Sequence, residues 1–305
     1  TNIGGATGYG VGSGSAHMVS IYDSTEDVHM FFLSNATSKI GTLTDTQAES
    51  TGYRSFSAAV GSSASDCQAI GVAWDQTNDV GVAWWSASAN SDYPTVRAFT
   101  VDGSGNGSIT FGTAVVLESN GTDLYGGIAC GSPNSAEFVA VWKDTTTELR
   151  YNTMTLSGTT ITIGTAGAVT RDGSEEYYVE GTQLLTYNPK TEKYYFSYNN
   201  SADNYDIMLK ELSYSGGSVT TDNTIKIVDS PTGNGHYWNV VYTGGTTAAA
   251  SATMLLIGRY DSNNVGSAQY SPAWDDTTTN LTTENYIGIA QATVADTATV
   301  TVDTI

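Results

Sequence analysis

One unit recurs five times along the 305 residues of this chain, and its length constrains the fold more than any other feature of the sequence. Each copy begins with a strand that ends in a turn, and a strongly apolar or aromatic second strand follows. The turn residues lie 52, 56, 57 and 55 positions apart: Asp23, Asp75, Gly131, Asn188 and Thr243. A third strand, a hairpin and a fourth strand complete the unit. Four antiparallel strands in a repeat of this length are typical of β-propeller blades, whereas immunoglobulin-like arrays need about 100 residues per copy.

The third copy shows the unit most clearly. A strand at 126–130 precedes the hydrophobic strand Phe138–Trp142, and a third strand, Leu149–Leu156, ends at a Ser-Gly turn before the fourth strand at 161–166. Glycine in such a turn supplies the positive φ that tight hairpins require. We therefore predict an all-β, five-bladed β-propeller over residues 1–276. Its blades should fall near residues 13–60, 61–118, 119–172, 173–230 and 231–276.

The fifth copy has no clear fourth strand of its own, and the N-terminus offers one. Ile3-Gly4-Gly5-Ala6 matches the start of the fourth strand at 111–114 and at 163–166. We predict that residues 2–12 pair beside the strand near Val265–Tyr270 and close the ring, which would remove exposed strand edges. Residues 277–305 show evenly spaced apolar residues and should form a short C-terminal β extension, which we expect to continue in the native polypeptide.

The composition agrees with this prediction and excludes two classes of partner. The chain has 33 Gly and only 11 Lys+Arg against 31 Asp+Glu, and its net charge is −20. Nucleic-acid binding needs Lys and Arg to displace counterions from phosphates, and anionic membranes attract basic segments. We therefore expect neither partner, and solubility explains the charge, with binding of a divalent cation as the alternative. Cys67 and Cys130 are too few for a disulfide framework, and we expect no bridge between them.

The repeats and one segment after them resemble a known class of proteins. Blades that read as an apolar strand, a Tyr-Asp-like turn, a second apolar strand and a hairpin leading to Ile-Thr-Ile-Gly-Thr-Ala are similar to the tandem repeats of large virion proteins from marine bacteriophages. The segment 279–290, Thr-Asn-Leu-Thr-Thr-Glu-Asn-Tyr-Ile-Gly-Ile-Ala, resembles the stretch that ends such arrays. The resemblance implies a tail-fibre, spike or decoration protein on the virion surface, outside the cell. Its implied partners are other virion proteins, host-surface glycan and further copies of the chain, and it brings no catalytic residues.

Three carboxylates give the strongest indication of an enzyme. Asp66, Asp123 and Glu180 are 57 positions apart and precede the first strands of three consecutive blades. The first strand of a blade lines the central channel, so these side chains could converge there. Five-bladed glycosidases use three such carboxylates as nucleophile or base, general acid and pKa modulator. A bound cation and ordinary loop polarity are the other interpretations.

Aromatic residues divide into two groups. Trp84, Trp85 and Trp142 lie in second strands, and we expect them to pack between blades. Four others lie at element ends, where an exposed ring could stack on a sugar, and form the candidate ligand-binding set: Trp238, Tyr237, Trp274 and Tyr270.

Metal sites have little support in the sequence, and no cofactor is predicted. Asp102, Ser104 and Asn106 place oxygen ligands at alternate positions, as in the first half of a calcium loop. The twelfth position is Thr113 rather than an acidic residue, and a Gly-rich hairpin turn explains the same residues without Ca²⁺. His17 and His236 precede the first strands of blades one and five, where two lone histidines could bind a metal, but we interpret both as structural.

The sequence thus favours a non-enzymatic virion surface protein that binds host-surface glycan or other virion proteins. A glycan-processing propeller enzyme that uses channel carboxylates is one alternative. A secreted bacterial lectin or adhesin is the other.

Overall fold

The computed structural model describes residues 17–25, 28–34, 41–46, 58–59, 67–87, 91, 93–102, 108–119, 125–132, 136–179, 183–228, 238–243, 253–259 and 265–272. These residues are all-β apart from one short 3-10 helix, Ser201–Asp203. No helix among them is long and apolar enough to cross a membrane.

The described strands form five sheets that follow one another along the chain, and most strands pair with their sequence neighbours. The first sheet contains β1 (His17–Asp23), β2 (Val28–Ser34), β3 (Gly41–Thr46) and β4 (Ala58–Ala59). The second contains β5 (Cys67–Asp75), β6 (Val80–Ala87), β7 (Thr95–Asp102), β8 (Ser108–Phe111) and β9 (Val115–Val116). The third contains β10 (Gly126–Ser132), β11 (Glu137–Thr145), β12 (Glu148–Ser157) and β13 (Thr160–Val169). The fourth contains β14 (Tyr177–Tyr178), β15 (Leu185–Asn188), β16 (Lys193–Asn200), β17 (Asp206–Ser215) and β18 (Ser218–Val228). The fifth contains β19 (Asn239–Tyr242), β20 (Met254–Arg259) and β21 (Val265–Tyr270).

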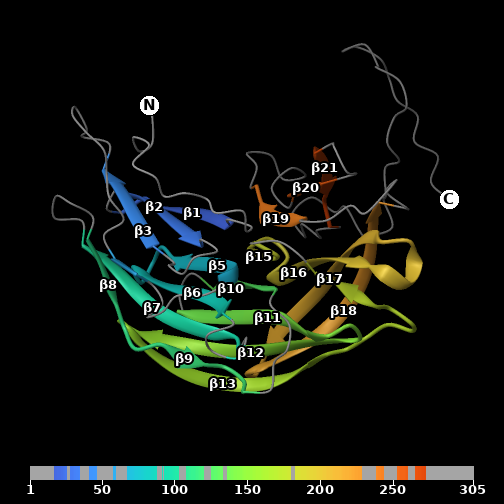
Figure 1. Cartoon of the computed structure of the whole chain (residues 1–305), viewed down its shortest axis with the longest axis horizontal. Coiled ribbons are helices and arrows are strands. Elements are labelled where there is room, and N and C mark those ends of the chain that lie inside the picture. Colours follow the sequence, from blue (N-terminus) through green and yellow to red (C-terminus); the bar gives the residue numbers. More distant parts are fainter. Residues whose placement is uncertain are drawn as a thin grey trace, which may run out of the picture.

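The sheets have a β-propeller-like arrangement. Figure 1 shows them following one another around a common centre, with β1, β5, β10, β15 and β19 nearest to it and the last strands at the periphery. Neighbouring inner strands are in contact, from β1 to β5, β5 to β10, β10 to β15 and β15 to β19. The predicted first and second strands of all five copies are therefore confirmed, whereas closure of the five sheets into a complete ring stays a prediction.

The inner strand β5 is buried on both faces because alternate side chains point to opposite neighbours. In β5, Ile70 and Val72 pack with residues of the first sheet, while Ala73 packs with residues of the third. Trp84 and Trp142 are buried in the core between the second and third sheets, and Trp85 is buried between the first and second. The expectation that these tryptophans pack between blades is confirmed. This packing explains why the second strands read as nearly continuous hydrophobic runs.

Some features were not predicted, and some predictions cannot be compared. The two-residue strands β9 and β14 pair with β7 and β16 at places where the sequence showed only loops. The predicted closing strand at 2–12 and the C-terminal extension at 277–305 lie outside the described residues. Cys130 forms no disulfide within the described part of the chain.

Candidate functional site

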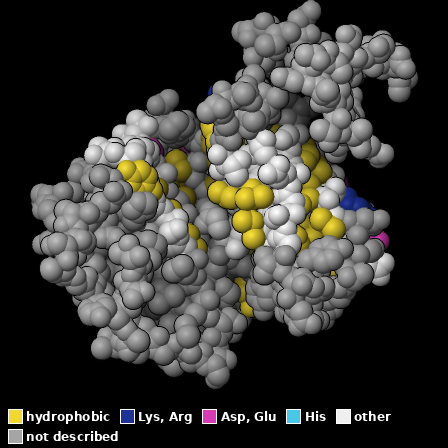
Figure 2. All heavy atoms as spheres, turned by 90° about the horizontal axis from the view of Figure 1, so that it is seen from above, with side chains coloured by type: hydrophobic (Ala, Val, Ile, Leu, Met, Phe, Trp, Pro, Cys, Tyr) yellow, Lys and Arg dark blue, Asp and Glu magenta, His cyan; other side chains and the backbone are white. Residues whose placement is uncertain are grey.

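The inner strands of all five sheets end at one cavity, which we call the mouth cavity. Its volume is about 560 Å³. Seen from above, hydrophobic side chains flank a hollow between the side of the molecule that carries β1 and β2 and the side that carries β19 to β21 (Figure 2). The cavity is lined by residues from the ends of the five inner strands and the turns after them: Ile21, Tyr22, Val72, Ala73, Trp74, Asp75, Gln76, Ile128, Ala129, Cys130, Gln183, Leu185, Thr186, Tyr187, Pro189 and Tyr242.

A repeated side-chain turn fixes where the inner strands β1, β5 and β15 end. The carboxylate of Asp23 accepts a hydrogen bond from the backbone N–H of Thr25 at 2.9 Å, and Asp75 accepts one from Thr77 N–H at 2.9 Å. The side-chain oxygen of Asn188 does the same for the N–H two residues later, at 3.0 Å. Such side-chain turns bond their own backbone two residues on, which makes Asp and Asn favourable at the start of a tight connection. The residue just before each turn is thereby placed at the mouth cavity.

In four of the five copies that preceding residue is aromatic. These are the mouth aromatic residues: Tyr22, Trp74, Tyr187 and Tyr242. The third copy has Cys130 and Gly131 instead, and a Cβ at Gly131 would lie 1.6 Å from the hydroxyl oxygen of Tyr194. The absent side chain leaves room for the Tyr194 ring from the neighbouring sheet.

The mouth aromatic residues differ in how firmly the core holds them. Trp74 stacks on Phe99 with ring centroids 5.5 Å apart and an interplanar angle of 24°. Tyr187 is tilted against Tyr194 at 5.1 Å, and burial, followed by the charge of Glu192, raises the pKa of Tyr187. Tyr22 is 44% exposed and presents its ring to solvent. The packed rings of Trp74 and Tyr187 therefore form walls of the cavity, and the exposed ring of Tyr22 lies at its edge.

Two glutamines supply polar groups in the lining and join the sheets to one another. The amide of Gln76 donates to Asp23 Oδ1 at 2.6 Å, and its oxygen accepts from Ser24 N–H at 3.0 Å, which ties the second sheet to the first. Gln183 donates through Nε2 to the carbonyl of Ile128 in the third sheet at 3.3 Å and to that of Leu185 at 3.0 Å. Its backbone carbonyl also accepts from Val240 N–H of the fifth sheet at 2.9 Å.

The charge of the lining has one sign. Asp75 is the only ionisable carboxylate among the described lining residues, which include no Lys, Arg, His or Glu. Asp75 is 1% exposed and accepts hydrogen bonds from Thr77 N, from Asn78 N at 3.2 Å and from Asn78 Nδ2 at 2.7 Å. These donors are all uncharged. The cavity can therefore accommodate neutral or cationic groups better than anionic ones.

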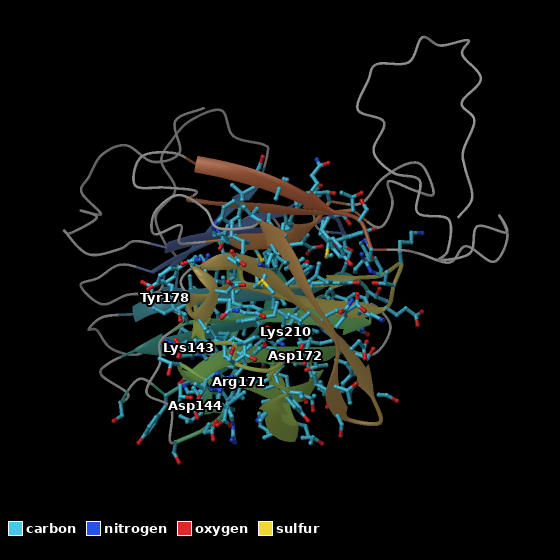
Figure 3. The ribbon with its side chains drawn as sticks, turned by 90° about the vertical axis from the view of Figure 1, so that its right-hand side faces the viewer. Lys143, Asp144, Arg171, Asp172, Tyr178 and Lys210 are labelled. Atoms are coloured by element: carbon cyan, nitrogen blue, oxygen red, sulfur yellow. The ribbon has the colours of Figure 1, made fainter. Side chains whose placement is uncertain are left out.

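A second cluster of ionisable groups surrounds Lys210 of β17, and it is structural. Lys210 is completely buried and donates to Glu175 Oε2 at 2.6 Å, Thr224 Oγ1 at 2.6 Å and Asp172 Oδ2 at 3.1 Å. Figure 3 shows Lys210 and Asp172 close together. Tyr198 donates to Glu175, and desolvation, followed by that hydrogen bond, raises the pKa of the Tyr198 hydroxyl. The three hydrogen bonds use all three ammonium protons, so the cluster pins the 172–175 loop to β17.

The predicted catalytic residues cannot be placed. Asp66, Asp123 and Glu180 lie outside the described residues, and the geometry of a glycosidase triad stays a prediction. The described residues contain no group of three or more His, Cys, Asp or Glu side chains that could hold a metal ion.

Of the predicted calcium residues, only Asp102 belongs to the part of the chain that the structure describes. Asp102 ends β7 and pairs with Ser108, the first residue of β8, as the hairpin interpretation requires. Ser104 and Asn106 lie outside the described residues, as does His236.

The candidate sugar-binding set needs one correction. Trp238 is 2% exposed, and a Cβ on Gly258 would lie 2.5 Å from Trp238 Cδ2, so the indole fills the space that this glycine leaves on β20. The prediction that Trp238 stacks on a sugar is wrong because its ring is in the core. Tyr270 is half-buried and tilted against Tyr195 at 6.2 Å, and Tyr237 and Trp274 lie outside the described residues.

The mouth aromatic residues were not among the predicted site residues, although the sequence contains a signal for them. The position just before each of the five turn residues reads Tyr, Trp, Cys, Tyr and Tyr. An aromatic residue repeated at one place in a unit, directly before the turn, marks one end of the channel.

Comparison with known proteins bears on the fold. No family model matches the chain, and no curated protein shows significant similarity to it. Among solved structures, an arginine-to-alanine triple mutant of AofleA from Arthrobotrys oligospora is similar with a TM-score of 0.57 and 8% identity, covering 85% of this chain and 70% of that one. A variant of the Aleuria aurantia lectin in complex with Fucα1-6GlcNAc has a TM-score of 0.46 and 12% identity, covering 85% of this chain and 76% of that one. At identities this low, similarity concerns the fold alone.

Proposed function

We propose that this chain is a non-enzymatic, carbohydrate-binding β-propeller whose binding site is the mouth cavity. The observation that carries the proposal is the delivery of an aromatic residue to this one cavity by four of the five inner strands. The proposal includes a closed ring of five blades, which the contribution of all five sheets to the cavity supports.

The lining suits the chemistry of a sugar. A pyranose ring has an apolar face, formed by its C–H groups, and a rim of hydroxyl groups. Tyr and Trp offer an apolar ring with a polar handle, while Gln76, Gln183 and Thr186 add donors and acceptors. The volume of about 560 Å³ falls in the range of about 300–1,000 Å³ that is usual for small-molecule sites.

A glycan array tests this proposal. We expect the wild-type chain to bind a subset of glycans, and Tyr22→Ala and Tyr242→Ala to weaken that binding about tenfold or more, because stacking contributes about 0.5–1.5 kcal/mol beyond area burial. The matched control is Ile163→Ala, which removes a side chain of 38% exposure on the peripheral strand β13. Binding that Tyr22→Ala and Tyr242→Ala leave unchanged would refute the mouth cavity as the site.

The absence of catalysis is part of the proposal and has its own test. Purified wild-type chain should release no reducing ends from the polysaccharides whose oligosaccharides it binds. Cleavage that disappears in Asp66→Asn, Asp123→Asn or Glu180→Gln variants would instead establish the glycosidase alternative.

We place the protein on a phage virion surface, where a glycan-binding propeller would attach the particle to its host. The repeat and the segment at 279–290 motivate this setting. Mass spectrometry of purified particles should find the protein among the structural proteins, and particles that lack it would contradict the setting without touching the binding proposal.

A further inference from the structure

We propose that the mouth cavity selects glycans that carry a protonated primary amine, that is, amino sugars whose nitrogen is not acetylated. This inference rests on the proposed function, because it names the class of carbohydrate that the same site would take.

The first argument is the uncompensated charge of Asp75. Its carboxylate is 1% exposed, and its hydrogen bonds come only from backbone N–H groups and the Asn78 amide, all of them neutral. Among the described lining residues no cation offsets this charge. The net charge of −20 adds a field of the same sign. A cation is therefore attracted to the cavity and a uronate or sialate carboxylate is repelled.

The second argument is a hydrogen-bond acceptor that the protein leaves unused. Gln183 Nε2 is held by the carbonyls of Ile128 and Leu185, which fixes the side-chain amide. Gln183 Oε1 is buried and accepts a hydrogen bond from no described residue, although Gln183 lines the cavity. An amide oxygen without a donor leaves its partial negative charge unshielded beside the cavity, which adds to the attraction for an ammonium group.

The third argument is the aromatic walls. The π face of Trp or Tyr carries partial negative charge and attracts a cation within about 6 Å of the ring centre. Tyr22, Tyr187 and Tyr242 add phenolic oxygens that can also accept from an ammonium group. The cavity thus offers aromatic faces and phenolic oxygens to the amine.

Isothermal titration calorimetry with three tetrasaccharides tests the inference. The probes are a glucosamine tetramer, the N-acetylglucosamine tetramer and a galacturonic acid tetramer, at a pH where the free amine is protonated. We expect the glucosamine tetramer to bind about tenfold more tightly than its acetylated counterpart, which corresponds to one desolvated cation–π or charge contact. The acidic tetramer should not bind. The preference should fall as salt is raised, because salt screens the attraction.

Two charge-matched variants show whether the local charge is responsible. Asp75→Asn keeps the turn acceptor Oδ1 and removes one negative charge, and should lower the affinity for the glucosamine tetramer about tenfold while leaving that for the acetylated tetramer unchanged. Asp203→Asn removes the same charge from an exposed side chain in the 3-10 helix and should change neither affinity. If Asp75→Asn does not fold, the salt dependence of wild-type binding decides the matter.

The outcomes separate this inference from the proposed function. Equal, salt-independent affinities for the glucosamine and acetylated tetramers, both weakened by Tyr22→Ala, would overturn the amine selectivity and leave carbohydrate binding intact. Equal effects of Asp75→Asn and Asp203→Asn would also overturn it. Absence of binding to every glycan, on the array and in calorimetry, would overturn both proposals.

Discussion

Removing the ammonium of Lys210 should cost this protein a large part of its stability. Lys210 is completely buried, and Glu175 beside it is only 6% exposed. Methionine at 210 fills much of the lysine volume but leaves the Glu175 carboxylate in the interior without its cation. Breaking a buried ion pair from one side costs about 3–5 kcal/mol. Glu175 keeps hydrogen bonds from Asp172 N at 3.0 Å and from Tyr177 at 3.3 Å, so we expect the lower end, about 3 kcal/mol.

The measurement is urea denaturation at neutral pH, followed by tyrosine and tryptophan fluorescence. A loss of about 3 kcal/mol is a substantial part of the roughly 5–15 kcal/mol that stabilises a typical domain, and it should move the midpoint clearly. The control is Lys190→Met, which changes an exposed lysine and should alter the free energy of unfolding by less than about 0.5 kcal/mol.

A double variant tests the reasoning itself. In Lys210→Met with Glu175→Gln both buried charges are absent. The double variant should therefore have a larger free energy of unfolding than Lys210→Met alone, even though it carries a second substitution. If Lys210→Met cost less than about 1 kcal/mol, or if the double variant were no more stable than the single one, the buried charge would not be the cause.

Three further predictions concern the sheets and their edges. Gly131→Ala should destabilise the protein by about 1–3 kcal/mol, because the new Cβ would lie 1.6 Å from the Tyr194 hydroxyl oxygen, and Gly131→Ala in a Tyr194→Leu background should cost less in the same urea titration. Burial raises the pKa of Tyr270 to about 12, above the value of about 10 in an unfolded chain. The unfolded state therefore releases this proton first, so stability present below about pH 10 is lost as the pH rises towards 12, and Tyr270→Phe should make that loss shallower. Deletion of residues 1–12 should lower the melting temperature sharply if they close the ring, and an unchanged melt would contradict the closure.

Much of the fold could be predicted from the sequence because the evidence for it is local. The spacing of the turn residues located the first two strands of every copy, including β1 with β2 and β19 with β20. The alternation of side chains along strands placed Trp84 and Trp142 between sheets. Short pairings such as that of β14 with β16 were missed, because two residues carry no periodicity and only the neighbouring strand makes them extended.

The candidate site was harder to predict because it depends on distances between residues more than 50 positions apart. Trp238 and Tyr22 both lie near the ends of inner strands, and the sequence does not tell an exposed ring from a buried one there. Gly258 on the adjacent strand leaves the space that Trp238 fills, whereas Tyr22 is 44% exposed. That difference arises from packing across strands, which no local pattern records.

The sequence by itself determined the repeat, the all-β class, the turns at Asp23, Asp75 and Asn188, and a charge unsuited to nucleic acid. These follow from short-range chemistry, since turn hydrogen bonds and strand alternation involve residues only a few positions apart. The tertiary structure decided that the residues before those turns meet at one cavity, that Gln183 Oε1 is buried there with no donor among the described residues, and that Lys210 is buried with Glu175. Those facts follow from how whole sheets pack against one another, because only that packing brings the ends of distant strands together.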